Sequence, residues 1–112
     1  MIHGLLVKDG TISECDLKDE LHAYYEALDC DLIDIVRRSI AGTEYAIVCD
    51  DEGLFKQDIR VSMVNEADLS PMLVGRLFIC KDGKRGKLAS LTADDVKRIK
   101  DRFLYGVVLG NW

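Results

Sequence analysis

Three consecutive carboxylates, Asp50, Asp51 and Glu52, are the side chains best suited to chemistry in this sequence. Carboxylate oxygens are the ligands that Mg²⁺ and Ca²⁺ prefer. The D-x-[DN]-x-[DN]-G spacing of an EF-hand is absent, however, and three adjacent residues cannot all point at one ion. We therefore predict a solvated acidic turn, completed by Gly53 with a positive φ, and keep a metal site or small enzyme built on this turn as the alternative. More carboxylates lie nearby in the sequence at Asp29, Asp31 and Asp34.

A second set of possible ligands begins at His22. Glu26 lies one helical turn after it, and Cys30 one turn further if the helix extends that far. Side chains at this spacing can share one helix face and bind a metal ion. The only other histidine is His3, so a metal site would require a long-range contact, and pairing of His22 with Glu26 is favoured. We expect His3 to end a strand without a functional role.

Other catalytic signatures are absent from the sequence. No serine or cysteine lies in a recognisable nucleophile motif, and the four cysteines form no CxxC pair, which predicts reduced and mostly buried thiols. Residues 83–87, Gly-Lys-Arg-Gly-Lys, lack the glycine spacing and the Lys-Ser/Thr end of a phosphate-binding loop. We interpret them as a solvated hairpin turn, with a small basic contact for an acidic partner as the alternative. The sequence thus predicts no cofactor and no catalytic residue.

The elements that position these residues begin with a strand at residues 2–7, which ends at the turn pair Asp9-Gly10. The segment after this turn has two interpretations. In the favoured one, residues 11–15 return as a short strand and Asp16 caps a helix. In the other, Ser13 is the cap. In both, the helix continues to about Leu28.

A β-hairpin comes next, with strands at residues 32–36 and 45–48 that are rich in β-branched side chains. If Ala41 and Gly42 form its tip, Val36 lies opposite Ile47 and Ile35 opposite Val48. Both faces of the hairpin are then mainly apolar. This pattern predicts strands in the interior of a sheet that is covered on both sides.

After the hairpin, residues 54–70 show no sustained period and predict a long surface loop. Residues 72–80 predict the longest strand, in which Gly75 marks a bulge or a close backbone approach. Thr92 and Asp95 form a capping box that starts the last helix. Beyond it, residues 107–109 predict a short strand, and Trp112 is expected to turn back onto apolar surface.

These elements predict one α+β domain, residues 1–112, with two helices and a mixed or mainly antiparallel sheet of four or five strands. The net charge of −5 and the scattered Lys and Arg residues disfavour nucleic-acid binding. No apolar run reaches the ~20 residues of a membrane helix, and no secretory signal begins the chain, so a cytoplasmic protein without membrane contact is expected. Strands that are apolar on both faces need more cover than two helices supply, which favours a homodimer.

Four segments of the sequence also support a resemblance: residues 25–28 (Tyr-Glu-Ala-Leu), 29–36 (Asp-Cys-Asp-Leu-Ile-Asp-Ile-Val), 50–54 (Asp-Asp-Glu-Gly-Leu) and 71–75 (Pro-Met-Leu-Val-Gly). On these residues the chain resembles a family of small bacterial proteins known only as a domain of unknown function. Members of that family occur on plasmids and phage-like elements, sometimes beside antirestriction genes. The resemblance implies no activity, cofactor or catalytic residue. It favours a non-enzymatic accessory or interaction protein of a mobile element, with an unidentified protein partner and a role against host defence.

Overall fold

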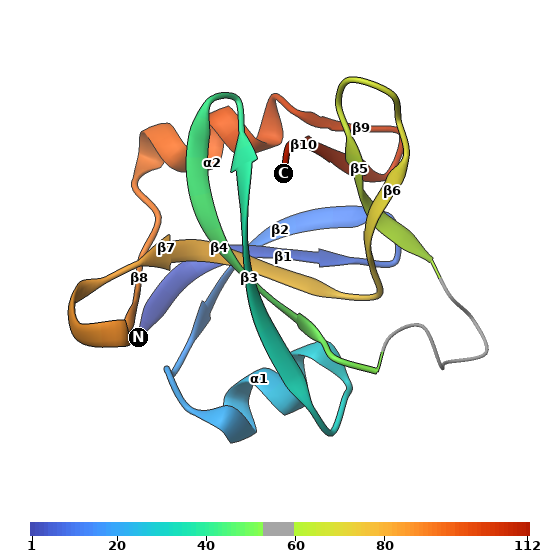
Figure 1. Ribbon diagram of the computed structural model, residues 1–112. Helices are drawn as coiled ribbons and strands as arrows, with labels where there is room; N and C mark the ends of the chain where they lie inside the picture. Colours follow the sequence, from blue (N-terminus) through green and yellow to red (C-terminus); the bar gives the residue numbers. More distant parts are fainter. Residues whose placement is uncertain (53–59) are drawn as a thin grey trace.

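Two β-sheets and two helices make up the described part of the chain, residues 1–52 and 60–112 of a computed structural model (Figure 1). The larger sheet has six strands in the order β2-β1-β7-β4-β3, with β8 paired to β7, and the smaller sheet has four in the order β6-β5-β10-β9. The strands are β1 (Ile2–Lys8), β2 (Thr11–Leu17), β3 (Ile33–Ile40), β4 (Thr43–Asp50), β5 (Val61–Asn65), β6 (Pro71–Val74), β7 (Leu77–Asp82), β8 (Leu88–Ala89), β9 (Phe103–Leu104) and β10 (Val107–Gly110). The helices are α1 (Leu21–Leu28) and α2 (Ala93–Lys100), and a short 3₁₀ turn, η2, spans Lys84–Gly86. The α+β class with two helices is confirmed, although the strands are divided between two sheets.

The β3–β4 hairpin has the register that the sequence predicts. Val36 lies opposite Ile47, and the tip residues Ala41 and Gly42 have φ angles of 51° and 83°. Positive φ at both central residues is the geometry of a type I′ turn, which matches the twist of the strands it joins. One correction concerns position: β4 is inside the sheet as expected, but β3 is its end strand.

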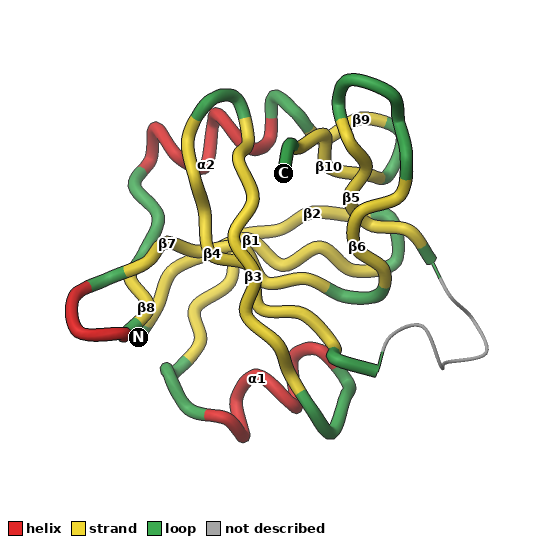
Figure 2. The backbone as a smooth tube through the Cα atoms, viewed as in Figure 1, coloured by secondary structure: helices red, strands yellow, loops and turns green. Residues whose placement is uncertain are grey.

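Side chains from both faces of the larger sheet are buried. On one face, Tyr45 and Ile47 of β4 pack in a cluster with Ile99 of α2 and with Met63 and Val108 of the smaller sheet. On the other face, a second cluster joins the sheet to α1 through these residues: Tyr24, Leu28, Ala46, Val48, Phe78 and Cys80. Figure 2 shows the same three layers, with α1 on one side of the larger sheet and α2 with the smaller sheet on the other. The predicted cover on both faces is therefore present within one chain.

The predicted strand at residues 72–80 is wrong, because the chain changes sheets in its middle. β6 belongs to the smaller sheet and β7 to the larger one. The break is at Gly75, where φ is 77° and the N–H donates to the carbonyl of Arg60 at 2.9 Å. The carbonyl of Gly75 accepts from the Ser62 hydroxyl. A residue with positive φ turns an extended chain away from its own direction, so one apolar run supplies two strands.

The predicted loop at residues 54–70 is also corrected. Residues 61–65 form β5, which pairs in parallel with β10 and buries Met63 completely. Residues 65–70 do form a turn, in which Asn65 and Asp68 accept backbone N–H bonds at 2.8 and 2.9 Å. The part of the prediction that falls on residues 53–59 lies outside the described residues.

The amino-terminal cap was predicted correctly for α2 but not for α1. In α2, the Thr92 hydroxyl accepts from the Asp95 N–H at 3.2 Å and Asp95 accepts from the Thr92 N–H at 2.9 Å, which confirms the capping box. In α1, the cap position is Glu20 and makes no side-chain cap bond. Asp16 does not cap this helix, because β2 continues to Leu17.

The carboxyl-terminal segment is ordered, as predicted. β10 lies between β5 and β9 in the smaller sheet, and Val108 is fully buried. Trp112, however, is 69% exposed, and its ring lies 4.3 Å from the guanidinium carbon of Arg38. The prediction that this ring returns onto apolar surface is therefore wrong: it stacks on a cation.

Candidate functional site

Several of the acidic residues singled out in the sequence meet in an open pocket of about 360 Å³. The end of α1 contributes Asp29, which has left-handed backbone angles (φ 50°, ψ 57°) and directs the following residues toward the end of β4. The lining residues are Tyr25, Glu26, Asp29, Cys30, Asp31, Asp50 and Glu52. The fold thus brings Asp50 and Glu52 together with Glu26, while Asp51 and His22 are not part of the lining.

Asp50 has a structural task inside this pocket. It is 9% exposed, and its Oδ1 accepts the backbone N–H of Glu52 at 2.9 Å. A side chain that binds the backbone two residues further on closes an Asx turn. Among residues 1–52 and 60–112, no group of three His, Cys, Asp or Glu side chains is arranged to hold a metal ion. The expected conformation of Gly53 falls outside the described residues.

The pair of His22 and Glu26 lies on the solvent side of α1. The distance from His22 Nε2 to Glu26 Oε2 is 3.6 Å, and the two side chains are 87% and 78% exposed. This is the i, i+4 contact that the helical spacing predicts. Cys30 lies beyond the end of the helix, so the three possible ligands do not share one helix face.

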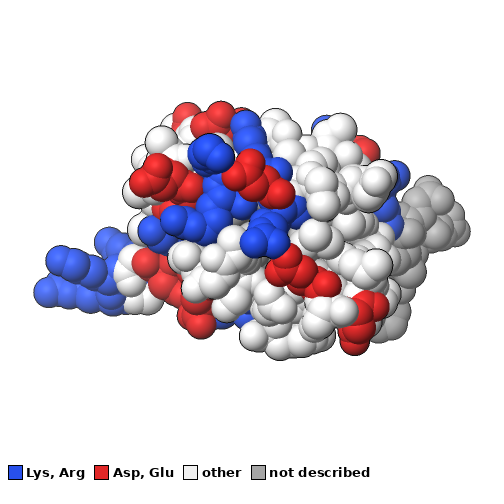
Figure 3. All heavy atoms as spheres, turned by 90° about the horizontal axis from the view of Figure 1, so that it is seen from above, with Lys and Arg blue, Asp and Glu red and all other residues white. Residues whose placement is uncertain are grey.

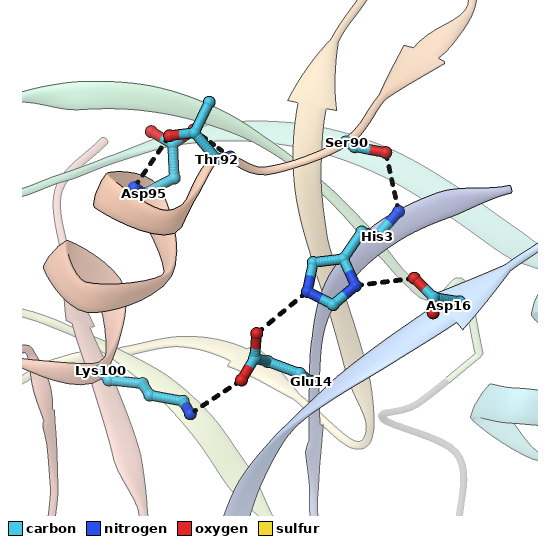
Figure 4. Close-up of polar contacts among 7 residues, drawn as sticks. All are labelled: His3, Glu14, Asp16, Ser90, Thr92, Asp95 and Lys100. Atoms are coloured by element: carbon cyan, nitrogen blue, oxygen red, sulfur yellow. Dashed lines mark hydrogen bonds and ion pairs between the residues drawn. The ribbon is translucent and has the colours of Figure 1, made fainter.

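His3 is in a charged cluster that sequence reasoning missed (Figure 4). Its Nδ1 lies 2.6 Å from Asp16 Oδ1 and its Nε2 lies 3.0 Å from Glu14 Oε1. Glu14 also accepts from Lys100 Nζ of α2 at 3.5 Å. The signal was available, because a two-residue turn at Asp9-Gly10 places position 3 opposite position 16.

The surroundings of His3 favour its protonated form. The hydrogen bond to Asp16 and then that to Glu14 raise the pKa of the imidazole above its ordinary value of 6.5. A general base needs a neutral ring with one accessible nitrogen. Because both nitrogens of His3 face carboxylates, we interpret the cluster as a clamp that joins β1, β2 and α2.

Asp95 is the second carboxylate with a dense set of partners. Its side chain is 3% exposed and accepts from Tyr45 Oη at 2.9 Å, Arg98 Nη1 at 3.0 Å and Lys81 Nζ at 2.9 Å, besides Thr92. Burial opposes ionisation and is the largest single effect, yet the hydrogen bonds led by those from Thr92 and Lys81 outweigh it. They hold the pKa of Asp95 well below its usual range. This carboxylate fastens α2 to the larger sheet.

The four thiols are free, and two of them lie in the core. Burial raises the pKa of Cys49 to about 11 and that of Cys80 to about 12. A thiol with such a pKa is almost entirely protonated at neutral pH and is a poor nucleophile. The prediction of reduced thiols agrees with this arrangement.

A basic hairpin projects from the molecule between β7 and β8. Its tip presents Lys84, Arg85 and Lys87, all exposed. Figure 3 shows these basic atoms at the projecting end, apart from the mixed charges over α2. Among the described residues, no ion pair joins the three cations to a carboxylate, whereas Arg37, Lys81, Lys97, Arg98, Lys100 and Arg102 each have one.

Comparison with known proteins identifies one family. A family model described as "Domain of unknown function (DUF3846)" matches residues 2–104, a span that includes the pocket, the His3 cluster and the basic hairpin. No curated protein and no solved structure matches the chain. In the described ranges, no helix has both the length and the apolar character needed to cross a membrane. The resemblance to a domain of unknown function is thus confirmed.

Proposed function

The chain belongs to the family described as Domain of unknown function (DUF3846), and we propose that it is a non-enzymatic interaction protein that binds an acidic protein partner through its basic hairpin. The observation that carries this proposal is the group of cations at the hairpin tip, which have no ion pair within residues 1–52 and 60–112. On a chain with a net charge of −5, three projecting cations give a local field opposite to that of the whole molecule. Complementary charge of this kind orients a partner and speeds its association.

The backbone at the tip supports the same proposal. Arg85 has φ 58° and ψ 40°, a left-handed conformation in which glycine or asparagine is normally found. An arginine there costs roughly 1–2 kcal/mol relative to the ordinary helical region. Residues held in such conformations concentrate at binding sites. The conformation directs a long cationic side chain outward from the turn.

A pair of matched variants tests the hairpin. The first changes Lys84 and Lys87 to Glu, and the control changes the exposed Lys8 and Lys18 to Glu, which alters the net charge equally. Each protein is immobilised and exposed to a bacterial extract. We expect a partner that the wild type and the control retain, that salt of about 0.5 M releases, and that the hairpin variant does not bind. Retention of the same proteins by all three forms, or by none, would contradict the proposal.

The bacterial and mobile-element proteins that the sequence resembles support a finer version of this proposal. In it, the partner is a protein of host defence and the two meet in the cytoplasm. The competing function is a small metal-binding domain or enzyme that uses Asp50, Asp51 and Glu52. A rise in melting temperature with Ca²⁺ or Mg²⁺ would favour that alternative.

A further inference from the structure

The outer edge of β3 is a second surface suited to binding. β3 is the end strand of the larger sheet, and among the described residues only Ser39 forms a β-bridge on that side, with Asn111. There, Ser39 and Asn111 exchange two backbone hydrogen bonds of 2.9 and 2.7 Å. At Ser39, the outward groups of β3 thus accept another backbone segment in antiparallel geometry.

The register of the hairpin defines which backbone groups face outward. Ile40 and Thr43 flank a two-residue turn and therefore bond to each other across the hairpin. Outward and inward groups alternate along an antiparallel strand. Ser39, Arg37 and Ile35 consequently point their N–H and C=O groups away from β4, which the contact between Ser39 and Asn111 confirms.

Two side chains of β3 itself each cover one of these outward groups. Asp34 Oδ1 accepts the N–H of Ile35 at 2.8 Å, and Arg38 Nη1 donates to the carbonyl of Arg37 at 2.8 Å. Charged side chains at a free edge normally discourage indiscriminate strand pairing. In β3, the two covering side chains are of opposite charge and lie at equal distances in sequence from Val36.

We propose that β3 pairs with β3 of a second copy of this chain, antiparallel about a two-fold axis at Val36. In this register the N–H of Ile35 bonds to the carbonyl of the partner's Arg37, so each group that is now covered gains a backbone partner. Asp34 then lies directly opposite the partner's Arg38. The charges that shield the free edge thereby become two cross-strand ion pairs.

Other registers lack this complementarity. An axis at Ile35 places Asp34 opposite the partner's Val36. An axis at Arg37 places two like charges opposite each other and brings Ile35 to the partner's Ser39, whose outward groups already bond to Asn111. In the favoured register, the bonds between Ser39 and Asn111 also limit the length of the pairing. The partner strand must turn away from the edge after its Asp34, because the outward groups of Ser39 are already bonded.

The side chain of Arg38 is already held in a restricted conformation before the proposed dimer forms. Its guanidinium is held 4.3 Å from the Trp112 ring, which leaves fewer conformations to be lost on binding. A guanidinium has five N–H donors, and the bond from Nη1 to the carbonyl of Arg37 uses one of them, so donor capacity toward a carboxylate remains. The interface is independent of the basic hairpin.

Charge exchange across the axis tests the pairing. Arg38→Asp and Asp34→Arg each place like charges opposite one another twice in the dimer, and the double variant restores opposite charges. Sedimentation equilibrium should show a dimer for the wild type and an increase in dissociation constant on the order of tenfold or more for each single variant. The double variant should return close to the wild-type value. A wild type that stays monomeric up to roughly 1 mM, or single variants that dimerise like the wild type, would overturn the proposal.

Amide hydrogen exchange of the wild type tests the β3 pairing even if a variant fails to fold. Pairing should slow exchange of the Ile35 and Arg37 amides as protein concentration rises. The amide of Val36 faces β4 and is the internal control, since its protection should not depend on concentration. Exchange of all three amides that is independent of concentration would rule out the interface.

Discussion

Replacing Asp95 with asparagine removes one buried charge and leaves the size of the side chain nearly unchanged. Its two oxygens now accept from Tyr45, Arg98, Lys81 and both donors of Thr92, at 2.9–3.0 Å. An asparagine keeps one acceptor and turns two donors toward this group. At least one of the cations then loses its acceptor in a site where the carboxylate is 3% exposed.

The expected loss follows from these contacts. Each hydrogen bond to a charged group contributes about 1.5–3 kcal/mol net, but bonds that share one acceptor are not additive. The side chains of Lys81 and Arg98 are 35% and 34% exposed, so water partly replaces a lost carboxylate oxygen. We therefore expect Asp95→Asn to lower the free energy of unfolding by about 1.5–3 kcal/mol, the contribution of one such bond.

Urea unfolding monitored by circular dichroism measures this loss. Asp94→Asn is the matched control, because Asp94 is exposed in the same first turn of α2 and contributes about 0.3–1 kcal/mol through the helix dipole. A loss for Asp95→Asn no larger than that of the control would refute the reasoning.

The pH dependence of the difference gives a further check. The pKa of Asp95 is lower in the folded chain than in the unfolded chain, where it is about 3.9. Its contribution is therefore complete above the unfolded value and is lost as pH falls toward the folded value. The stability difference between wild type and Asp95→Asn should be constant above about pH 5 and should shrink below about pH 4.

Four further outcomes are expected. Because the folded pKa of His3 is raised, its contribution is complete below about pH 6.5 and is lost at higher pH; the melting temperatures of wild type and His3→Gln should therefore converge as pH rises from 6 to 9, and parallel curves would contradict this. Gly75→Ala should cost about 1–2 kcal/mol from backbone strain alone, since no described atom beyond the adjacent residues lies within 4 Å of the added Cβ, and Gly75→Asn should cost less in the same urea titration. Changing Asp51 to Asn together with Glu52 to Gln should alter the free energy of unfolding by under ~1 kcal/mol, and a Ca²⁺-dependent rise in melting temperature seen only in the wild type would instead indicate a metal site. Trp112 should emit near the wavelength of free tryptophan and be quenched by acrylamide, whereas a blue-shifted emission would show that its ring is buried.

Features set by neighbouring residues were predictable from the sequence. The register of the β3–β4 hairpin follows from a two-residue turn at Ala41-Gly42, which fixes every pair after the first. The capping box of α2 depends on Thr92 and Asp95, only three residues apart. In both cases, the interacting groups are close in sequence, so their contact does not depend on the rest of the fold.

Features set by distant residues were not predictable in the same way. β5 becomes a strand because β10, more than 40 residues later, supplies a parallel partner. At Gly75 the chain leaves the smaller sheet and enters the larger one. The run of apolar residues does not show whether the strand continues through this glycine or changes sheets there. Intrinsic strand preference gives way to tertiary context at both places.

In the candidate site, too, contacts between residues close in sequence were predictable and those between distant residues were not. The i, i+4 contact of His22 with Glu26 follows from helical spacing. The pocket that joins Glu26 to Asp50 depends on the packing of α1 against the larger sheet, which brings the helix close to the end of β4. The cluster around His3 is intermediate, since Asp16 follows from the β1–β2 turn but Lys100 follows only from the docking of α2.

The states of four titratable groups support the proposed non-enzymatic role. His3 has both nitrogens against carboxylates, Asp95 has its oxygens saturated by donors, and the core thiol of Cys80 has a raised pKa. Burial, followed by the hydrogen bond with Asp19, likewise raises the pKa of Tyr24. His3, Cys80 and Tyr24 are stabilised in their protonated forms, which are poor bases and nucleophiles, and the lowered pKa of Asp95 makes its carboxylate a weak base. The two surfaces proposed for binding, the cations at the hairpin tip and the backbone groups at the edge of β3, use none of these four groups.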